Sequence, residues 1–337
     1  MLERTLAIPL HRAAQQAAPV LVQGPRGAGK TTLLRREFPA HPYLPLDDPS
    51  LRTRARQDPA GFLARLRGPA LIDDLHRAPE LVAHLTGQPG TYRLILASSR
   101  RLHLPVTTLE LHPPTPAELE RRPALSLAML GRFVPAAPPA PVPHPPWPNP
   151  RSFLDHDLAA LLRVHDRDQF ERFARAAASR SAQILDQQAL ARECGIAHRT
   201  AVRWLAVLDH CFETLRLPPA PLPFGRRLHR APKLHFHASN AFESRVVTTL
   251  YRNACHAGLP PQFFYWKDSN GLEIPLVVVE EGAPPLPVLP IAEPHPMAEA
   301  RLRRWMQLAR AGQGALITTR PGPSRRGGVL RYALSQL

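Results

Sequence analysis

Short runs of apolar residues alternate with helical segments through the first 133 residues of the chain. The runs are APVLVQ (18–23), PALIDD (69–74) and YRLILAS (92–98). Continuous apolar runs of this length, separated by helical patterns, predict buried strands of a parallel sheet. Residues 1–133 are therefore expected to form an α/β domain.

The pattern changes twice after this domain. Residues 134–150 (VPAAPPAPVPHPPWPNP) predict a stiff linker, because proline removes a backbone donor and fixes φ. Residues 151–231 predict a helical domain, since apolar side chains recur there at intervals of three and four. Residues 232–337 predict a small α/β domain with strands at KLHFH, QFFYW, IPLVVVE and GALITT and a crossover helix over 297–311.

The loop after the first apolar run carries a phosphate-binding motif. It reads Gly24-Pro-Arg-Gly-Ala-Gly29-Lys30-Thr31, which matches G-x-x-x-x-G-K-[ST] between a strand and a helix. In such a loop backbone N–H groups surround phosphate oxygens, the lysine reaches the β- and γ-phosphates, and the hydroxyl binds Mg²⁺. ATP and Mg²⁺ are the expected cofactors, and the expected nucleotide-binding residues are Gly24, Pro25, Arg26, Gly27, Ala28, Gly29, Lys30, Thr31 and Thr32.

Acidic and hydroxyl side chains end two further strands of the predicted sheet. Asp73, at the end of PALIDD, is expected to bind Mg²⁺ together with Thr31, and Asp74 to orient the attacking water. Ser98 and Ser99 follow the strand YRLILAS, and we expect one hydroxyl, that of Ser99, near the γ-phosphate. Lys30, Asp74 and Ser99 are thus the candidate catalytic residues.

Three local motifs in this half of the chain resemble one family. Leu46-Asp47-Asp48-Pro49, Asp73-Asp74 and the segment 76–81 (HRAPEL) are similar to the bacterial and archaeal AAA-type P-loop ATPases that end in a C-terminal domain of unknown function. The resemblance extends to the end of the chain with shortened loops. It implies an ATPase followed by a winged-helix-like segment and a domain resembling the PD-(D/E)XK nucleases.

Two departures from that family predict slow hydrolysis. Asp74 stands where the family has glutamate, so the carboxylate is one methylene shorter. A displacement of about 1 Å can cost roughly 100-fold in rate. The family's Ala-Gly-Arg loop is also missing, which leaves Arg100 and Arg101 as the substitutes for its arginine finger.

Residues 185–210 predict a helix–turn–helix unit with Ala191 at the helix contact and Gly195 in the turn. Its second helix, 198–208, is expected to bury Val202, Leu205 and Leu208. The outward residues Arg199, Thr200 and Arg203 are then candidate contacts for nucleic acid. The alternative is a unit that serves only packing or protein contact.

A basic cluster follows, formed by Arg226, Arg227, Arg230 and Lys233. His235 and His237 alternate on one face of the next strand and predict a solvated or stacked pair, not a metal site. The net charge of +16 favours a nucleic-acid partner. Because lysine occurs only at positions 30, 233 and 267, the arginine excess can also reflect the coding bias of a GC-rich genome.

The nuclease-like domain lacks most of the residues that the family's chemistry needs. Glu243 and Glu273 are present, but Pro275 stands at the position of the metal aspartate. Leu289 and Ile291 stand where the Glu/Lys pair is expected. This domain is predicted to keep the nuclease fold without nuclease activity.

The composition limits the class of protein further. No run approaches the length of a membrane span, the N-terminus does not resemble a signal peptide, and Cys194, Cys211 and Cys255 are too few and too scattered for a disulfide framework. A cytoplasmic ATPase that is monomeric or homo-oligomeric and contacts DNA or a protein is the favoured interpretation. The alternatives are a nucleotide-dependent switch that binds only protein, and an ATP-dependent nuclease.

Overall fold

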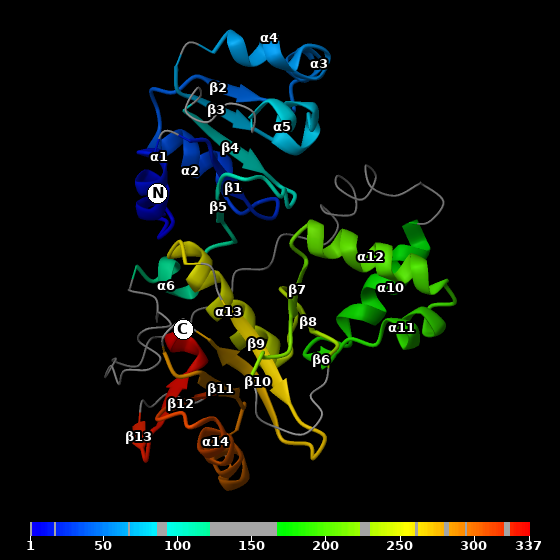
Figure 1. Cartoon of the computed structure of the whole chain (residues 1–337), viewed down its shortest axis with the longest axis vertical. Coiled ribbons are helices and arrows are strands. Elements are labelled where there is room, and N and C mark those ends of the chain that lie inside the picture. The colour runs from blue at the N-terminus through cyan, green and yellow to red at the C-terminus, as the bar shows by residue number, and fades with distance from the viewer. Residues whose placement is uncertain are drawn as a thin grey trace.

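The computed structural model describes residues 2–16, 18–66, 68–85, 93–121, 167–222, 230–259, 262–279, 283–293, 295–319 and 324–337 (Figure 1). The segment 134–150, expected as a linker, lies outside these residues, as do Arg226 and Arg227. No described helix is long and apolar enough to cross a membrane.

A five-stranded sheet forms the N-terminal part of the molecule, in the order β2-β3-β4-β1-β5. Every pairing between neighbours is parallel, as the buried apolar runs predicted. The strands are β1 (Val20–Gln23), β2 (Tyr43–Pro45), β3 (Ala70–Asp73), β4 (Leu94–Ser98) and β5 (Thr107–Glu110). Since all five run in one direction, the ends of β1, β3 and β4 meet at one edge of the sheet.

Helices cover both faces of this sheet (Figure 1). One apolar cluster joins the sheet to α1 (Ala7–Ala14) and α2 (Lys30–Glu37). A second cluster joins it to α3 (Pro49–Gln57), α4 (Pro59–Ala64) and α5 (Glu80–Leu85). The short helices η1 (Leu75–Arg77) and α6 (Pro116–Leu119) complete this part.

The middle part packs three helices against a small antiparallel sheet. Its elements follow as α10 (Arg167–Ala178), β6 (Gln183–Ile184), α11 (Gln187–Glu193), α12 (His198–His210), β7 (Thr214–Leu217) and β8 (Lys233–Phe236). The sheet order is β6-β8-β7. The sequence pattern assigned residues 233–237 to the last domain, but β8 pairs with both β6 and β7 and so belongs to this sheet.

The buried face of α12 differs from the predicted one at Val202. This side chain is 38% exposed, whereas Leu205 and Leu208 are buried as expected. Trp204 takes the interior position and contacts Phe170 and Phe173 of α10 edge to face. Because the large ring of Trp204 faces α10, Val202 lies on a side of α12 that points to solvent.

The C-terminal part contains a six-stranded mixed sheet in the order β13-β14-β12-β11-β10-β9. Its elements are α13 (Phe242–His256), β9 (Phe263–Lys267), β10 (Glu273–Val278), β11 (Leu286–Pro290), α14 (Pro296–Ala309), β12 (Gly314–Thr318), β13 (Ser324–Arg326), β14 (Val329–Ala333) and η4 (Leu334–Gln336). The helix α14 connects the parallel strands β11 and β12, which confirms the predicted crossover.

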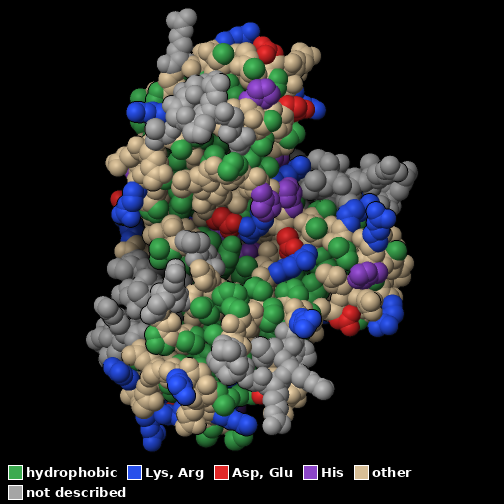
Figure 2. All heavy atoms as spheres, viewed as in Figure 1, with side chains coloured by type: hydrophobic (Ala, Val, Ile, Leu, Met, Phe, Trp, Pro, Cys, Tyr) green, Lys and Arg blue, Asp and Glu red, His purple; other side chains and the backbone are tan. Residues whose placement is uncertain are grey.

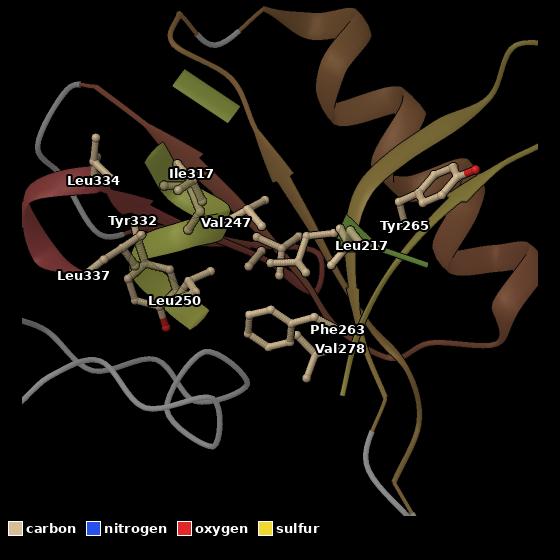
Figure 3. Close-up of a cluster of buried hydrophobic side chains, with 14 of the residues drawn as sticks. Leu217, Val247, Leu250, Phe263, Tyr265, Val278, Ile317, Tyr332, Leu334 and Leu337 are labelled. Atoms are coloured by element: carbon tan, nitrogen blue, oxygen red, sulfur yellow. The ribbon is translucent and has the colours of Figure 1, made fainter. Parts of the chain in front are cut away.

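One apolar core ties the C-terminal part to the middle part (Figure 3). Val247 and Leu250 of α13 pack with Phe263 and Val278, and Leu217 of β7 joins the same cluster. The chain after β7 also pairs with β9, since the N–H of Ala220 bonds to the carbonyl of Tyr265. The middle part and the C-terminal part therefore share a continuous interior.

Candidate nucleotide site and its links to the C-terminal half

The loop between β1 and α2 lies at the carboxyl edge of the parallel sheet. Gly27 and Gly29 have φ values of 75° and 89°, a left-handed conformation that glycine adopts without strain. A Cβ on Gly24 would lie 1.8 Å from the carbonyl oxygen of Leu111, so only glycine fits there. The loop leads directly into α2, whose first residue is Lys30.

Lys30 is buried inside this loop, with 7% of its surface exposed. Its Nζ donates hydrogen bonds of 2.9 Å to the carbonyl oxygens of Gly24 and Pro25. The ammonium group therefore sits within the loop, near the N-terminus of α2, where the helix dipole favours an anion.

Thr31 and Asp73 meet across the sheet edge, although 42 positions separate them in sequence. The Thr31 hydroxyl donates to Oδ2 of Asp73 over 2.6 Å. Tyr43, at the start of β2, donates to the same oxygen over 3.0 Å. Burial and the neighbouring carboxylate of Asp73 raise the pKa of Tyr43, so its hydroxyl keeps its proton and remains a donor.

Asp74 follows in the left-handed region, with φ 57° and ψ 39°. Its carboxylate accepts from Nε of Arg77 over 3.3 Å. Burial raises the pKa of Asp74, and the adjacent charge of Asp73 adds to this shift. Aspartate is among the residues that tolerate left-handed backbone, which gives a local reason for aspartate at this position.

The two serines after β4 have separate partners. The Ser98 hydroxyl donates to the carbonyl of Arg100 over 2.7 Å and closes a local turn. The Ser99 hydroxyl lies 3.4 Å from Nε2 of His76, whose Nδ1 is 3.9 Å from Asp74. Burial, reinforced by nearby arginines, lowers the pKa of His76 to about 3, so the ring that lies between Ser99 and Asp74 is neutral.

Two residues near the loop, Tyr43 and Arg4, belong to none of the motifs, and His76 was part of a motif but was given no role. Arg4 precedes α1 and donates to the carbonyl of Ala28 in the loop over 2.7 Å. It also donates to the carbonyl of His112 over 2.6 Å and pairs with Glu118 over 3.3 Å. Arg4 belongs to no sequence motif, because its role depends on how the N-terminal segment packs against the glycine loop.

These residues fit a magnesium nucleotide. The loop offers a cation and a helix N-terminus for phosphates, and Thr31 and Asp73 bring a hydroxyl and a carboxylate oxygen within 2.6 Å of each other. Oxygen donors of these two kinds are the ligands that Mg²⁺ takes beside phosphates. Fold and site together define a P-loop nucleotide-binding domain.

Comparison with known proteins agrees with this class. Residues 16–112 match the family described as AAA domain, a class of nucleotide-binding ATPases. Residues 149–238 match a domain of unknown function (DUF8612), a match that includes the middle part and reaches β8. Uncharacterized proteins of Mycobacterium tuberculosis and Mycobacterium bovis are each 28% identical to the chain over 321 aligned residues, covering 83% of this chain and 72% of each relative.

Arg101, expected as a substitute for the finger arginine, lies instead between the nucleotide domain and α12. Its backbone N–H and its Nε bond to the carbonyls of His210 and Asp209, the last two residues of α12, over 2.9 and 3.1 Å. Its guanidinium stacks on Phe212 at 4.3 Å and pairs with Glu110 at the end of β5. A cation is favourable at the C-terminus of a helix, so this contact holds α12 against the loop that follows β4.

The candidate nucleic-acid residues lie on the surface where they are described. Arg199 and Arg203 are exposed on α12, Thr200 is half-buried there, and Arg230 is exposed before β8. On the face drawn in Figure 2, the basic side chains lie at several separate places and do not form one continuous patch. All four residues lie in the middle part of the molecule. Arg199 is near the start of α12, whereas Arg101 contacts the other end of that helix.

Lys233 does not belong to the expected surface cluster. It is 2% exposed, and its Nζ lies 2.7 Å from Glu243 of α13 and 2.5 Å from Glu273 of β10. Glu243 and Glu273 thus enclose a lysine that enters from β8. The sequence-based view that they have no lysine partner is wrong.

Pro275 and the pair His235 and His237 are also among the described residues. Pro275 is buried in β10, next to a register irregularity between Ile274 and Val277, which is where a strand accepts a residue without an N–H. His237 stacks on His112 with ring centroids 5.3 Å apart, but both His235 and His237 are buried and so are not solvated.

Proposed function

We propose that this chain is a magnesium-dependent ATPase of low turnover that transmits its nucleotide state to a C-terminal half that contacts nucleic acid. The observation that carries the ATPase assignment is the contact between Thr31 and Asp73, 2.6 Å long, at the mouth of the glycine loop. It joins a hydroxyl and a carboxylate from distant elements where a metal beside phosphates would need them.

The roles at the site follow from this arrangement. Thr31 and Asp73 would hold Mg²⁺, which would neutralise charge on the phosphates, and Lys30 would bind the β- and γ-phosphates. Asp74 would orient the attacking water and Ser99 would lie near the γ-phosphate. The backbone of Gly24, Pro25, Arg26, Gly27, Ala28, Gly29 and Thr32 would surround the phosphate groups.

Two routes support coupling between this site and the C-terminal half. One runs from the loop carbonyl of Ala28 through Arg4 to Glu118, whose Oε2 is 3.2 Å from Nδ1 of His256 at the end of α13. The other runs from the loop after β4 through Arg101 to the end of α12. A change in the glycine loop would therefore act on α13, and a change in the loop after β4 would act on α12.

The order of elements in the C-terminal half supports the finer assignments. Three helices and a β6-β8-β7 sheet are the arrangement expected of a winged helix, in which α12 would be the recognition helix. In the last part, Lys233 between Glu243 and Glu273 leaves no free carboxylate pair for a metal, which favours an inactive nuclease fold.

Replacing Lys30 by alanine is expected to weaken ATP binding by roughly 10- to 150-fold, because a hydrogen bond to a charged group contributes roughly 1.5–3 kcal/mol. A fluorescent ATP analogue measures the affinity. Lys267→Ala, which removes a lysine from the C-terminal part, is the control and should bind as the wild type does. Unchanged affinity in Lys30→Ala would refute the nucleotide assignment of the loop.

Replacing Arg199 and Arg203 together by alanine is expected to lower the salt dependence of DNA binding by about two units of log–log slope, since each phosphate contact contributes about one. Gel shifts at several salt concentrations, with and without ATP, give the slope. Arg12→Ala with Arg54→Ala removes the same charge from exposed positions of the nucleotide domain and should leave the slope unchanged.

The outcome of that experiment also separates the alternative function. If no shift occurs, or if both double variants change the slope equally, the C-terminal half does not bind nucleic acid through α12. A nucleotide-dependent switch that binds a protein partner would then be the better account.

A further inference from the structure

A cluster of three different donor groups lies where the nucleotide domain meets α13. Glu110 ends β5, His112 follows two residues later, and Cys255 comes from the last turn of α13. Their ligand atoms all lie within 4.8 Å of one another. Oε2 of Glu110 is 3.2 Å from Nε2 of His112 and 4.0 Å from Sγ of Cys255.

We propose that Glu110, His112 and Cys255 form a binding site for a borderline-soft divalent cation, Zn²⁺, between the nucleotide domain and α13. A thiolate, an imidazole and a carboxylate form a mixed sulfur, nitrogen and oxygen set, which suits Zn²⁺ and not Mg²⁺ or Ca²⁺. Three protein ligands with a fourth position left to water is a common arrangement for zinc.

The distances are close to those of a tetrahedral site. Metal–ligand bonds of about 2.0–2.3 Å place the ligand atoms of such a site roughly 3.3–3.6 Å apart. The oxygen and nitrogen already lie 3.2 Å apart, and the sulfur is 4.0 Å from the oxygen. The sulfur must therefore move closer to the oxygen and nitrogen when a metal binds.

Neighbouring groups hold Glu110 without covering its Oε2 on all sides. The Tyr251 hydroxyl donates to Oε2 over 2.9 Å, while Gln23 and Arg101 bond to the other oxygen, Oε1. Such outer contacts orient a metal-binding carboxylate. Nε2 of the fully buried His112 is the ring nitrogen that faces Glu110, whereas Nδ1 has no hydrogen-bond partner among the described residues.

A pocket gives the site an entrance and room for a water ligand. It has a volume of about 290 Å³, and its lining includes Glu110, Tyr251 and Cys255. A buried metal site needs a path of this kind.

A thiolate and a carboxylate together cancel the two charges of Zn²⁺, but not those of the nearby cations Arg252 and Arg101, the latter paired with Glu110, which oppose a dication. Burial raises the pKa of the Cys255 thiol, so the free thiol is protonated at neutral pH. Binding forms a metal–sulfur bond and releases the thiol proton to the buffer, one proton for each metal ion.

The test uses the full chain, freed of metal with a chelator and titrated with Co²⁺ and then Zn²⁺. We expect one Co²⁺ per chain with a thiolate-to-cobalt charge-transfer band, which Zn²⁺ then abolishes because it binds nitrogen and sulfur sites more tightly. Cys255→Ser should remove the band and weaken Zn²⁺ binding at least tenfold. Cys194→Ser, which changes the half-buried cysteine of the middle part, is the matched control and should keep both.

A second measurement on the wild-type chain covers the case in which Cys255→Ser does not fold. Zn²⁺ should protect Cys255, and not Cys194, from alkylation mapped by mass spectrometry. The proposal is overturned if no thiolate band forms, if the band survives in Cys255→Ser, or if Zn²⁺ leaves the alkylation of Cys255 unchanged.

Discussion

Replacing Asp74 by asparagine is expected to slow ATP hydrolysis by roughly 10²–10⁴-fold, the usual effect of removing a group that positions or deprotonates the attacking water. ATP affinity should change little, because the proposed phosphate and metal contacts come from Lys30, Thr31 and Asp73. Asparagine has the same shape and tolerates the left-handed backbone at this position, so folding should be preserved. Steady-state phosphate release and analogue binding measure the two effects.

The wild-type rate should also depend on pH through Asp74. Burial and the charge of Asp73 raise its pKa, so its carboxylate takes up a proton at a higher pH than an ordinary aspartate. Since the ionised form is the one that would activate water, hydrolysis should rise with pH and fall on acidification. The same profile in Asp74→Asn would assign the titration to another group.

The variant Asp74→Glu addresses the length of the side chain. We expect a higher kcat, because one methylene restores the reach of the glutamate found in the related family. It should also cost about 1 kcal/mol of stability, since a longer side chain is less favourable in left-handed backbone. A lower kcat with normal ATP binding would show that the site is adapted to aspartate.

Replacing Lys233 by methionine is expected to lower the free energy of unfolding by about 3–5 kcal/mol, the cost of removing one partner from a buried ion pair. Lys233 is 2% exposed and lies between Glu243 and Glu273, so its loss leaves two carboxylates close together without their shared cation. Urea unfolding of the C-terminal half gives the change.

Lys267→Met is the matched control. Lys267 pairs with Glu273 over 2.8 Å but is 30% exposed, and partly exposed pairs contribute only about 0–1 kcal/mol. If both lysine variants lose the same stability, the buried position of Lys233 is not what matters.

The effect of pH gives a further check on Lys233→Met. Burial raises the pKa of Glu243 even in the presence of Lys233, whereas at Glu273 the two lysines outweigh burial and lower the pKa. Without Lys233 the folded-state pKa of Glu243 should rise further above that of the unfolded chain, whereas Lys267 still lowers the pKa of Glu273. Stability is then lost as pH rises and regained as Glu243 takes up a proton on acidification. Adding Glu243→Gln should restore part of the stability at neutral pH.

The nucleotide loop is the feature that the sequence predicted most completely. The spacing from Gly24 to Thr31 constrains eight consecutive residues, and the apolar strand before them fixes where the loop lies. Asp73 could be paired with Thr31 in advance because both follow strands of one parallel sheet, whose carboxyl ends meet at the same edge. The same reasoning could not find Tyr43 or Arg4, since neither belongs to a motif.

Errors arose where a side chain's environment depends on elements distant in sequence. Val202 was predicted to be buried from helical spacing, but the aromatic rings of α10 select Trp204 for the interior. Arg101 was named as a substitute for the missing finger arginine, and the structure shows it in contact with the end of α12. The spacing of apolar residues along a helix indicates its buried side only approximately. The rotation of the helix about its axis depends on the side chains of the element that packs against it.

The sequence alone determined the parallel nucleotide domain, the loop and its acidic partner, and the crossover in the last sheet, because each depends on short-range pattern and on the chirality of the chain. Only the tertiary structure decided that Lys233 is an internal cation and that Glu110, His112 and Cys255 come together. A charged residue within a basic stretch of sequence is predicted to be solvated. Whether it is buried depends on which opposite charges the fold brings to it from other elements. For Lys233 those charges come from α13 and β10, which no pattern around residue 233 contains.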